Sequence, residues 1–278
     1  MNIISFGGGT NSTAMIIGIH QRGIPIDMIV FADTGGEKPH TYEFIETLNI
    51  YLAARGLPEI TVVRKVDENG DVMTLEDHCQ KYNRLPGVAY GISDCAVCYK
   101  IGPQEKFCNN HPECKAAWKN GEKVNKFIGY DAGEGRRINK RAERDAADKK
   151  YTYHYPLIDW GWGRDECVAA IQSEGLPLPG KSSCFFCPNN RKPEIQALWE
   201  NHPDLFDRAV AIEHNARKQK RSGKPTVIIG LGREWTWESY RDTYLHNAAF
   251  LADHFVLPGF EDITGGCCCG MPCGCNEE

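Results

Sequence analysis

The order of apolar segments near the start of the chain constrains the fold most. Apolar runs of strand length alternate there with longer segments whose apolar residues recur at helical spacing. The expected strands are Asn2–Ser5, Met28–Ala32 and Ile60–Val63, and the expected helices between them are Thr13–Gln21 and Pro39–Arg55. Such alternation joins parallel strands through helices that cover the sheet. The sequence therefore predicts an α/β fold, an open, mostly parallel sheet with helices on both faces.

The pattern is weaker after the third expected strand. Lys123–Gly129 is predicted to return to the sheet, and Val227–Leu231 to form a late strand. Helical spacing predicts three helices, over Arg164–Ser173, Pro193–His202 and Pro203–Lys220. We expect one domain over residues 1–262 and a flexible, cysteine-rich tail over residues 263–278.

Composition narrows the class of protein. The chain has 278 residues, of which 41% are hydrophobic, and a net charge of −5, which is typical of a globular protein. It contains no run of about 18 apolar residues and no secretory signal, so we expect no membrane span and a cytoplasmic location. In a reducing compartment, its 13 cysteines indicate metal ligands or reactive thiols.

A glycine-rich segment, Gly7–Thr13 (GGGTNST), separates the first expected strand from the first expected helix. Glycines let a phosphate approach the backbone, and a helix N-terminus offers unpaired N–H groups and a positive dipole end. Ser12 is placed where its hydroxyl would cap the helix and contact an anion. The segment is neither a Walker A loop nor a dinucleotide fingerprint. We predict a phosphate-binding loop, with a turn that binds no ligand as the alternative.

A second polar segment follows the second expected strand. Asp33, Thr34 and Gly35 stand where that strand ends. Ligands of open α/β sheets bind beside the carboxyl ends of the strands. We therefore expect this turn to face the same crevice as the glycine-rich loop.

Five segments, taken in order, carry a family resemblance. GGGTNS resembles the SGGxDS loop of the PP-loop proteins, and DTGGEKPHTYEFI resembles the DTGxxxPETYxFI segment of the phosphoadenosine phosphosulfate (PAPS) reductases. CYKIGPQEKF, GYDAGEGRRINKR and YPLIDWGWGRDECVAAIQSEGLPLPGKSSCFFCP resemble later segments of those reductases. The resemblance covers roughly residues 1–200.

The resemblance implies an adenine-nucleotide α-hydrolase-like, Rossmann-like fold with the nucleotide across the strand ends. The residues that it implies for nucleotide binding are Ser5, Gly7, Gly8, Gly9, Thr10, Asn11, Ser12, Asp33, Thr34, Gly35, Glu134 and Arg136. It also implies that Lys100 and Arg137 neutralise phosphate or sulfate charge during catalysis.

The loop departs from the family pattern at three positions. Gly7 replaces the serine of SGGKDS, Thr10 the lysine and Asn11 the aspartate. The loop therefore lacks both a cation and a carboxylate able to associate with magnesium. Splitting ATP between the α- and β-phosphates needs such charge neutralisation, whereas binding a sulfonucleotide does not.

Two cysteine pairs have metal-ligand spacing. Cys95 and Cys98 form one CxxC segment, and Cys184 and Cys187 form another. Each pair places two thiolates about one turn apart, and together they make a four-thiolate set. The arrangement resembles that of the iron–sulfur adenylylsulfate reductases, which implies a 4Fe–4S cluster. Structural zinc and unliganded thiols are the alternatives.

The predicted tail carries five further cysteines, namely Cys267, Cys268, Cys269, Cys273 and Cys275. The PAPS reductases have an essential cysteine on a C-terminal segment, so the resemblance implies a catalytic thiol among Cys267, Cys268 and Cys269. Their Glu-Cys-Gly-x-His motif is absent here. An inert tail is the alternative.

Three functions fit these features. The first is a sulfonucleotide reductase, in which a cysteine attacks the sulfate sulfur of PAPS or adenylylsulfate and sulfite is released. The second is ATP-dependent sulfur transfer to a nucleobase in RNA or DNA. The third is a nucleotide-sensing iron–sulfur module without turnover. The overall motif match favours the reductase.

The expected partners follow from these functions. They are an adenine nucleotide and either a thiol reductant or a sulfur-donor protein. Nucleic acid is added if the enzyme is a thiolase, and the basic segment Arg136–Lys150 would then contact phosphates. A solvated helix face is the alternative for that segment.

Overall fold

The computed structural model describes residues 1–218, 228–245 and 247. Met1–Trp237 form one compact unit, and Glu238–Glu278 form a second. The predicted boundary at residue 262 and the tail over 263–278 lie outside the described residues. In the described part of the chain, no helix is long and apolar enough to cross a membrane.

The first unit is built on a five-stranded sheet in the order β3-β2-β1-β4-β5. The strands are β1 (Asn2–Phe6), β2 (Met28–Asp33), β3 (Ile60–Arg64), β4 (Val124–Ile128) and β5 (Tyr151–His154). Every neighbouring pair is parallel. The predicted α/β fold is confirmed, including the return of the chain to the sheet as β4. The order of the strands reverses between β1 and β4, which is where ligands bind in sheets of this kind.

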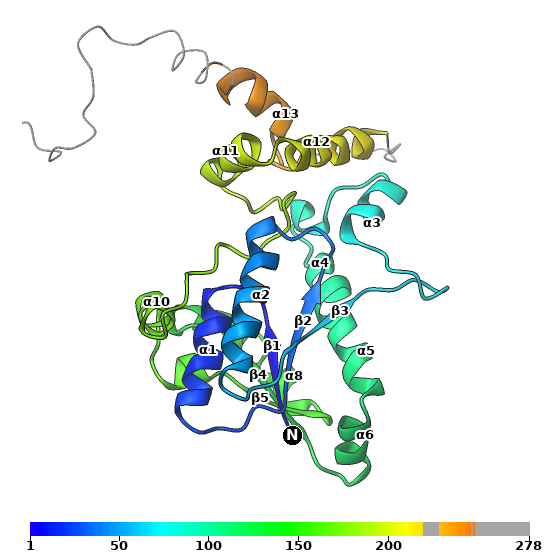
Figure 1. The fold of residues 1–278 in the computed structure, drawn as a ribbon. Coiled ribbons are helices and arrows are strands. Elements are labelled where there is room, and N and C mark those ends of the chain that lie inside the picture. Colours follow the sequence, from blue (N-terminus) through cyan, green and yellow to red (C-terminus); the bar gives the residue numbers. More distant parts are fainter. Residues whose placement is uncertain (219–227, 246, 248–278) are drawn as a thin grey trace, which may run out of the picture. The chain divides into compact units, whose positions relative to one another are not determined.

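Helices cover both faces of the sheet (Figure 1). On one face, α1 (Thr10–Gln21), α2 (Pro39–Ala53) and α10 (Arg164–Ser173) bury an apolar core that includes Ile4 and Leu48. On the other face, α5 (Gly102–Asn110) and α6 (Pro112–Lys119) cover a smaller core that includes Ile3 and Cys108. Because side chains alternate along β1, Ile3 and Ile4 serve opposite cores.

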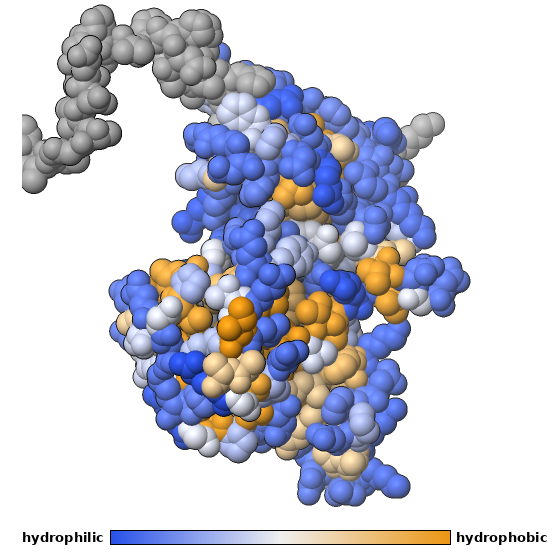
Figure 2. Space-filling model, viewed as in Figure 1, coloured by the Kyte–Doolittle hydropathy of each residue, from blue (hydrophilic) through white to orange (hydrophobic). Residues whose placement is uncertain are grey.

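The remaining helical segments are mostly short. They are α3 (Leu75–Lys81), η1 (Gly87–Tyr90), α4 (Asp94–Ala96), η2 (Val97–Ile101), η3 (Ala132–Glu134), α7 (Gly135–Asn139), α8 (Ala142–Ala147), α9 (Pro156–Asp159), α11 (Lys192–Asn201) and α12 (Pro203–Arg217). Helix α13 (Trp237–Tyr240) begins at the last residue of the first unit, and η4 (Arg241–Leu245) follows it in the second. Figure 2 shows mostly hydrophilic side chains over α11 and α12, and a mixture of apolar and hydrophilic side chains over the part that contains the sheet.

Two sequence predictions need correction, and one strand was missed. The late strand Val227–Leu231 is wrong, because residues 228–231 contain only an isolated bridge from Gly230 to Arg233. Strand β5 was not predicted, since YTYH is short and half polar. Helix α1 begins at Thr10 with Gly9 as its N-cap, so Ser12 lies inside the helix and does not cap it.

Candidate functional site

The glycine-rich loop joins β1 to α1 at the switch point of the sheet. Gly8 has φ +74°, and a Cβ there would lie 3.0 Å from Thr41 Cγ2. The Ser12 hydroxyl accepts from the Gly7 amide (3.1 Å) and donates to the Gly9 carbonyl (3.0 Å). The loop is thus wound around one side chain at the start of a 12-residue helix. This geometry presents first-turn N–H groups and the positive dipole end to an anion.

Asn11, at the position where the PP-loop that this segment resembles has an aspartate, lies beside the carboxylate of Asp131. Its Nδ2 donates to Asp131 Oδ2 at 2.9 Å, and Arg164 donates to its Oδ1 at 3.4 Å. Asp131 follows β4, and it also accepts from the Gly133 amide. Gly129 permits the approach, since a Cβ there would lie 3.0 Å from the backbone of Ser12. The carboxylate missing from the loop is therefore present beside it in space.

The Asp33 carboxylate stabilises its own turn. Its Oδ1 accepts from Tyr42 OH (2.9 Å) and the Gly35 amide (2.8 Å), and its Oδ2 accepts from Arg64 Nε (2.9 Å). Burial, and then the Asp33 charge, raise the pKa of Tyr42. Asp33 does not line the pocket described below. We therefore interpret it as the residue that shapes the strand-end turn.

A buried ion pair, not predicted from the sequence, lies after β2. Lys100 Nζ donates to Glu37 Oε1 at 3.0 Å, and the Glu37 side chain is 0% exposed. Thr34 Oγ1 lies 3.4 Å from the same oxygen and 3.1 Å from Cys184 Sγ. Burial disfavours the charged form of Lys100, but Glu37 and Cys184 outweigh this effect and raise its pKa. The predicted catalytic lysine is therefore held by a buried carboxylate, with the Cys184 thiol near enough to act on its charge.

The second cysteine pair lies next to this ion pair. The Cys187 amide donates to the Cys184 carbonyl (3.0 Å), so a tight turn holds the two cysteines. Cys184 pairs with Glu37 in an antiparallel bridge. Burial raises the pKa of the Cys184 thiol well above its ordinary value, although the nearby Lys100 opposes the rise.

The first cysteine pair lies on α4 and η2. Cys95 is half-buried and close enough to Cys187 to contribute to the rise in the pKa of Cys187, which burial dominates. Cys98 is exposed. Among the described residues, no group of three or more His, Cys, Asp or Glu side chains is arranged to hold a metal ion. All four thiols are of the type that binds an iron–sulfur cluster, and three of them, Cys95, Cys184 and Cys187, lie near one another. They are not arranged as a set of ligands around one point, so the four-thiolate site stays a prediction.

Glu134, Arg136 and Arg137 lie outside the pocket described below. Arg137 pairs with Glu134, and its guanidinium lies 4.3 Å above the ring of Tyr130. Arg136 is exposed. Their predicted contacts with the nucleotide therefore stay predictions. Cys267, Cys268 and Cys269 lie outside the described residues.

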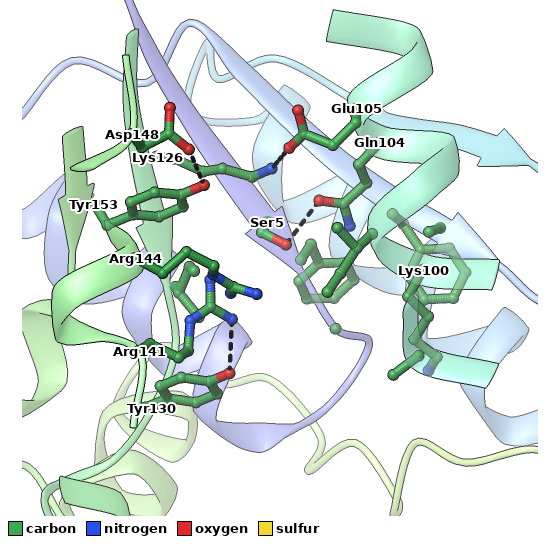
Figure 3. A pocket seen from close by; sticks show the side chains of 17 residues that line it. Ser5, Lys100, Gln104, Glu105, Lys126, Tyr130, Arg141, Arg144, Asp148 and Tyr153 are labelled. Atoms are coloured by element: carbon green, nitrogen blue, oxygen red, sulfur yellow. Dashed lines mark hydrogen bonds and ion pairs between the residues drawn. The ribbon is translucent and has the colours of Figure 1, made fainter. Parts of the chain in front are cut away.

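A pocket of about 380 Å³ opens at the switch point, on the α5 side of the sheet (Figure 3). Of the predicted site residues, Ser5, Gly7 and Lys100 line it. The other polar residues that line it are Gln104, Glu105, Lys126, Tyr130, Arg141, Arg144, Asp148 and Tyr153. The four basic side chains that line it are each paired with a carboxylate: Lys100 with Glu37, Lys126 with Glu105, and Arg141 and Arg144 with Asp145. The pocket is therefore rich in charged groups that are largely balanced.

Sequence reasoning missed most of these polar residues. Arg141 and Arg144 belong to the basic segment that was weighed as a solvated face. Lys126 lies within a short strand, where the alternation of side chains gives no sign that it is buried. Gln104 follows the Lys-x-x-Pro segment, and no local signal marks it.

Comparisons with known proteins add little. No protein-family model matches the sequence, and no curated protein matches it. Among solved structures, the chain is similar to the U34-tRNA thiolase NcsA from Methanococcus maripaludis with its [4Fe-4S] cluster. The identity is 12%, the TM-score is 0.38, and the match covers 81% of this chain and 75% of that one. A similarity of this size assigns no activity.

Proposed function

We propose that this protein is an ATP-dependent sulfur-transfer enzyme that activates a nucleobase in RNA or DNA. The observation that carries the proposal is the Asp131 carboxylate, 2.9 Å from Asn11 at the start of α1. From the loop sequence alone, the absence of a carboxylate counts against splitting ATP. Asp131 supplies an oxygen ligand of the type that the magnesium of MgATP prefers. This carboxylate moves ATP-dependent transfer ahead of sulfonucleotide reduction.

The proposed reaction has two steps. The carbonyl oxygen of the base attacks the α-phosphorus of ATP, and the bond to the β-phosphate breaks to release pyrophosphate. The terminal sulfur of a donor protein's persulfide then attacks the adenylated carbon, and the original oxygen leaves with AMP. A second thiol of the donor attacks the inner sulfur of the resulting S–S bond, which releases the thiolated base and leaves the donor with a disulfide. In the first step, the N–H groups at the start of α1 and the ammonium of Lys100 would stabilise the developing phosphate charge.

Sulfonucleotide reduction is the second candidate, favoured by the uncharged side chains of Thr10 and Asn11. In that reaction a thiolate attacks the sulfate sulfur of adenylylsulfate or PAPS and displaces the nucleotide. A second thiol then forms a disulfide with the first and releases sulfite. Lys100 would neutralise the sulfate, because it lines the pocket and lies near Cys184.

One assay separates the two candidates. The full chain, purified without oxygen, is incubated with radiolabelled ATP and an RNA or DNA acceptor, and in parallel with adenylylsulfate or PAPS and a thiol. Acceptor-dependent release of pyrophosphate and AMP supports sulfur transfer. Release of sulfite without use of ATP would establish the second candidate instead. Binding of ATP without either product would support the sensing module.

The role of Asp131 is tested by substitution. Asp131→Asn keeps the size of the side chain and removes its charge, and we expect pyrophosphate release to fall by about 10²- to 10³-fold, the usual effect of losing one preorganised electrostatic group. Asp71→Asn, in an exposed turn, is the matched control. Equal rates for the two variants would remove the observation on which the proposal stands.

We further propose that Cys95, Cys98, Cys184 and Cys187 hold a 4Fe–4S cluster, with structural zinc as the alternative. Bound beside Lys100, such a cluster would supply redox or sulfur-binding chemistry. Protein purified without oxygen should be brown and contain about four irons per chain. Cys184→Ala should remove the iron, whereas Cys79→Ala, at a buried thiol outside the set, should not. Colourless protein with one zinc would contradict the cluster.

A further inference from the structure

One amide side chain in the pocket is held in place at one end only. Gln104 lies on α5 and is 6% exposed. Its Oε1 accepts from the Ser5 hydroxyl at 2.9 Å, across 99 positions of sequence, and both residues line the pocket (Figure 3). Among the described residues, no contact to its Nε2 is found. Gln104 Nε2 is not one of the buried polar atoms that lack a partner, so it is accessible from the pocket, where its two N–H donors can reach a ligand or water.

The neighbourhood of Gln104 is typical of a site for a planar ligand. The buried ring of Phe31 lines the same pocket. Lys126 is 7% exposed at its side chain and is neutralised by Glu105 at 2.6 Å. Apolar walls with a few fixed polar groups are the usual construction of small-molecule sites.

The place of Ser5 on β1 fixes which part of a nucleotide would reach Gln104. Strand β1 ends at Phe6, so Gly7 follows the strand directly and lies about 7 Å along the chain from Ser5. Gly7 begins the loop proposed to hold the phosphates. A nucleotide with its phosphates at that loop would therefore place its base beside Ser5 and Gln104.

We propose that Gln104 is a specificity-determining residue that reads the base of the bound nucleotide and selects adenine. The inference rests on the proposed binding of ATP at the loop. An amide offers one acceptor beside one donor, which matches the 6-amino group of adenine and its neighbouring ring nitrogen. Guanine has an oxygen at that position, which would face Gln104 Oε1. In the observed orientation the Ser5 hydroxyl donates to that oxygen and leaves Nε2 as the donor toward a ligand, so turning the amide over for guanine would require the hydroxyl to change from donor to acceptor.

The test compares four ligands on wild type and Gln104→Leu by calorimetry: ATP, GTP, 7-deaza-ATP and purine riboside triphosphate, which lacks the 6-amino group. In wild type, we expect removal of the 6-amino group to weaken binding by about 10- to 100-fold, the range of a lost specific base contact. Gln104→Leu should bind ATP more weakly by a similar factor and no longer distinguish it from the analogue. This double-mutant cycle isolates the contact.

Further variants separate a direct contact from damage to the fold. Gln104→Glu keeps the acceptor and should still prefer ATP to the analogue without the amino group. Ser5→Ala frees the amide and should reduce the discrimination in part, whereas Gln172→Leu, on the exposed face of α10, should change nothing.

Two results would overturn the inference alone, namely equal affinity of wild type for GTP and ATP, or an unchanged ATP preference in Gln104→Leu. No binding of any nucleotide by wild type would overturn the proposed function and the inference together. The two failures are therefore distinguishable by whether wild type binds ATP.

Discussion

Replacing Lys100 with methionine should destabilise the protein, because the buried carboxylate of Glu37 would lose its cationic partner. Glu37 Oε1 accepts from Lys100 Nζ, and Glu37 Oε2 is buried with no hydrogen-bond partner among the described residues. Lys100→Met keeps most of the aliphatic stem and removes the charge. The Glu37 side chain, at 0% exposure, would then be an unpaired buried charge.

The size of the effect follows from the unequal burial of the partners. Removing one member of a fully buried pair costs about 3–5 kcal/mol. The Lys100 side chain is 36% exposed, so solvent screening reduces its share, and we expect about 2–3 kcal/mol for Lys100→Met. Glu37→Gln should cost only about 1 kcal/mol, because the ammonium left behind can reach water.

Urea denaturation without nucleotide measures the free energy of unfolding of wild type, of each single variant and of the double variant. The double variant Lys100→Met/Glu37→Gln should be more stable than Lys100→Met alone, since it removes the uncompensated charge. If Lys100→Met were as stable as wild type, or if the two substitutions were simply additive, the argument from the buried carboxylate would be refuted.

Two further predictions concern the glycine-rich loop and Glu174, which lies at the end of α10. Gly8→Val should lower the free energy of unfolding by about 2 kcal/mol and abolish ATP binding, because φ is +74° and a Cβ would press on Thr41. In Gly9→Ala the added Cβ would meet only an ordinary contact at 3.6 Å, so this control should keep its stability in thermal melts and its ATP binding in calorimetry. Glu174 has a lowered pKa, through hydrogen bonds from Gln21 and Arg55, so its contribution to stability is present above its ordinary pKa and is lost as the pH falls through the lower, folded value. Thermal melts at falling pH should therefore show a smaller loss of stability below about pH 5 for Glu174→Gln than for wild type. If the melting temperatures of the two proteins fell in parallel, ionised Glu174 would not contribute to stability in this way.

The sheet and its central helices could be predicted because their signals are local. Long apolar runs such as Met28–Ala32 identify buried parallel strands, and glycine breaks mark the ends of the helices between them. The edge strand β5 has no such run, since YTYH is half polar and buries mainly Tyr151. Val227–Leu231 has the composition of a strand, but composition does not provide a partner strand, and residues 228–231 form none.

The site divides in the same way. The loop and the strand-end turn are contiguous in sequence and were found. The groups that complete the pocket come from distant segments, because Gln104 reaches Ser5 across 99 positions and Lys100 reaches Glu37 across 63. A single sequence contains no signal for such pairs, since each depends on the order of strands in the sheet.

Asn11 shows why a departure from the motif that a loop resembles has to be judged in the fold as well as along the chain. Read along the chain, the exchange of aspartate for asparagine removes a carboxylate and with it one requirement for splitting ATP. In the fold, β4 is the neighbour of β1, so the segment after β4 lies beside the loop after β1. Asp131, 120 positions away, thereby contacts the amide of Asn11, and an amide can donate to a carboxylate where an aspartate would repel it. The asparagine in the loop and the aspartate after β4 are thus physically complementary, so a carboxylate lies beside the loop although the loop itself contains none.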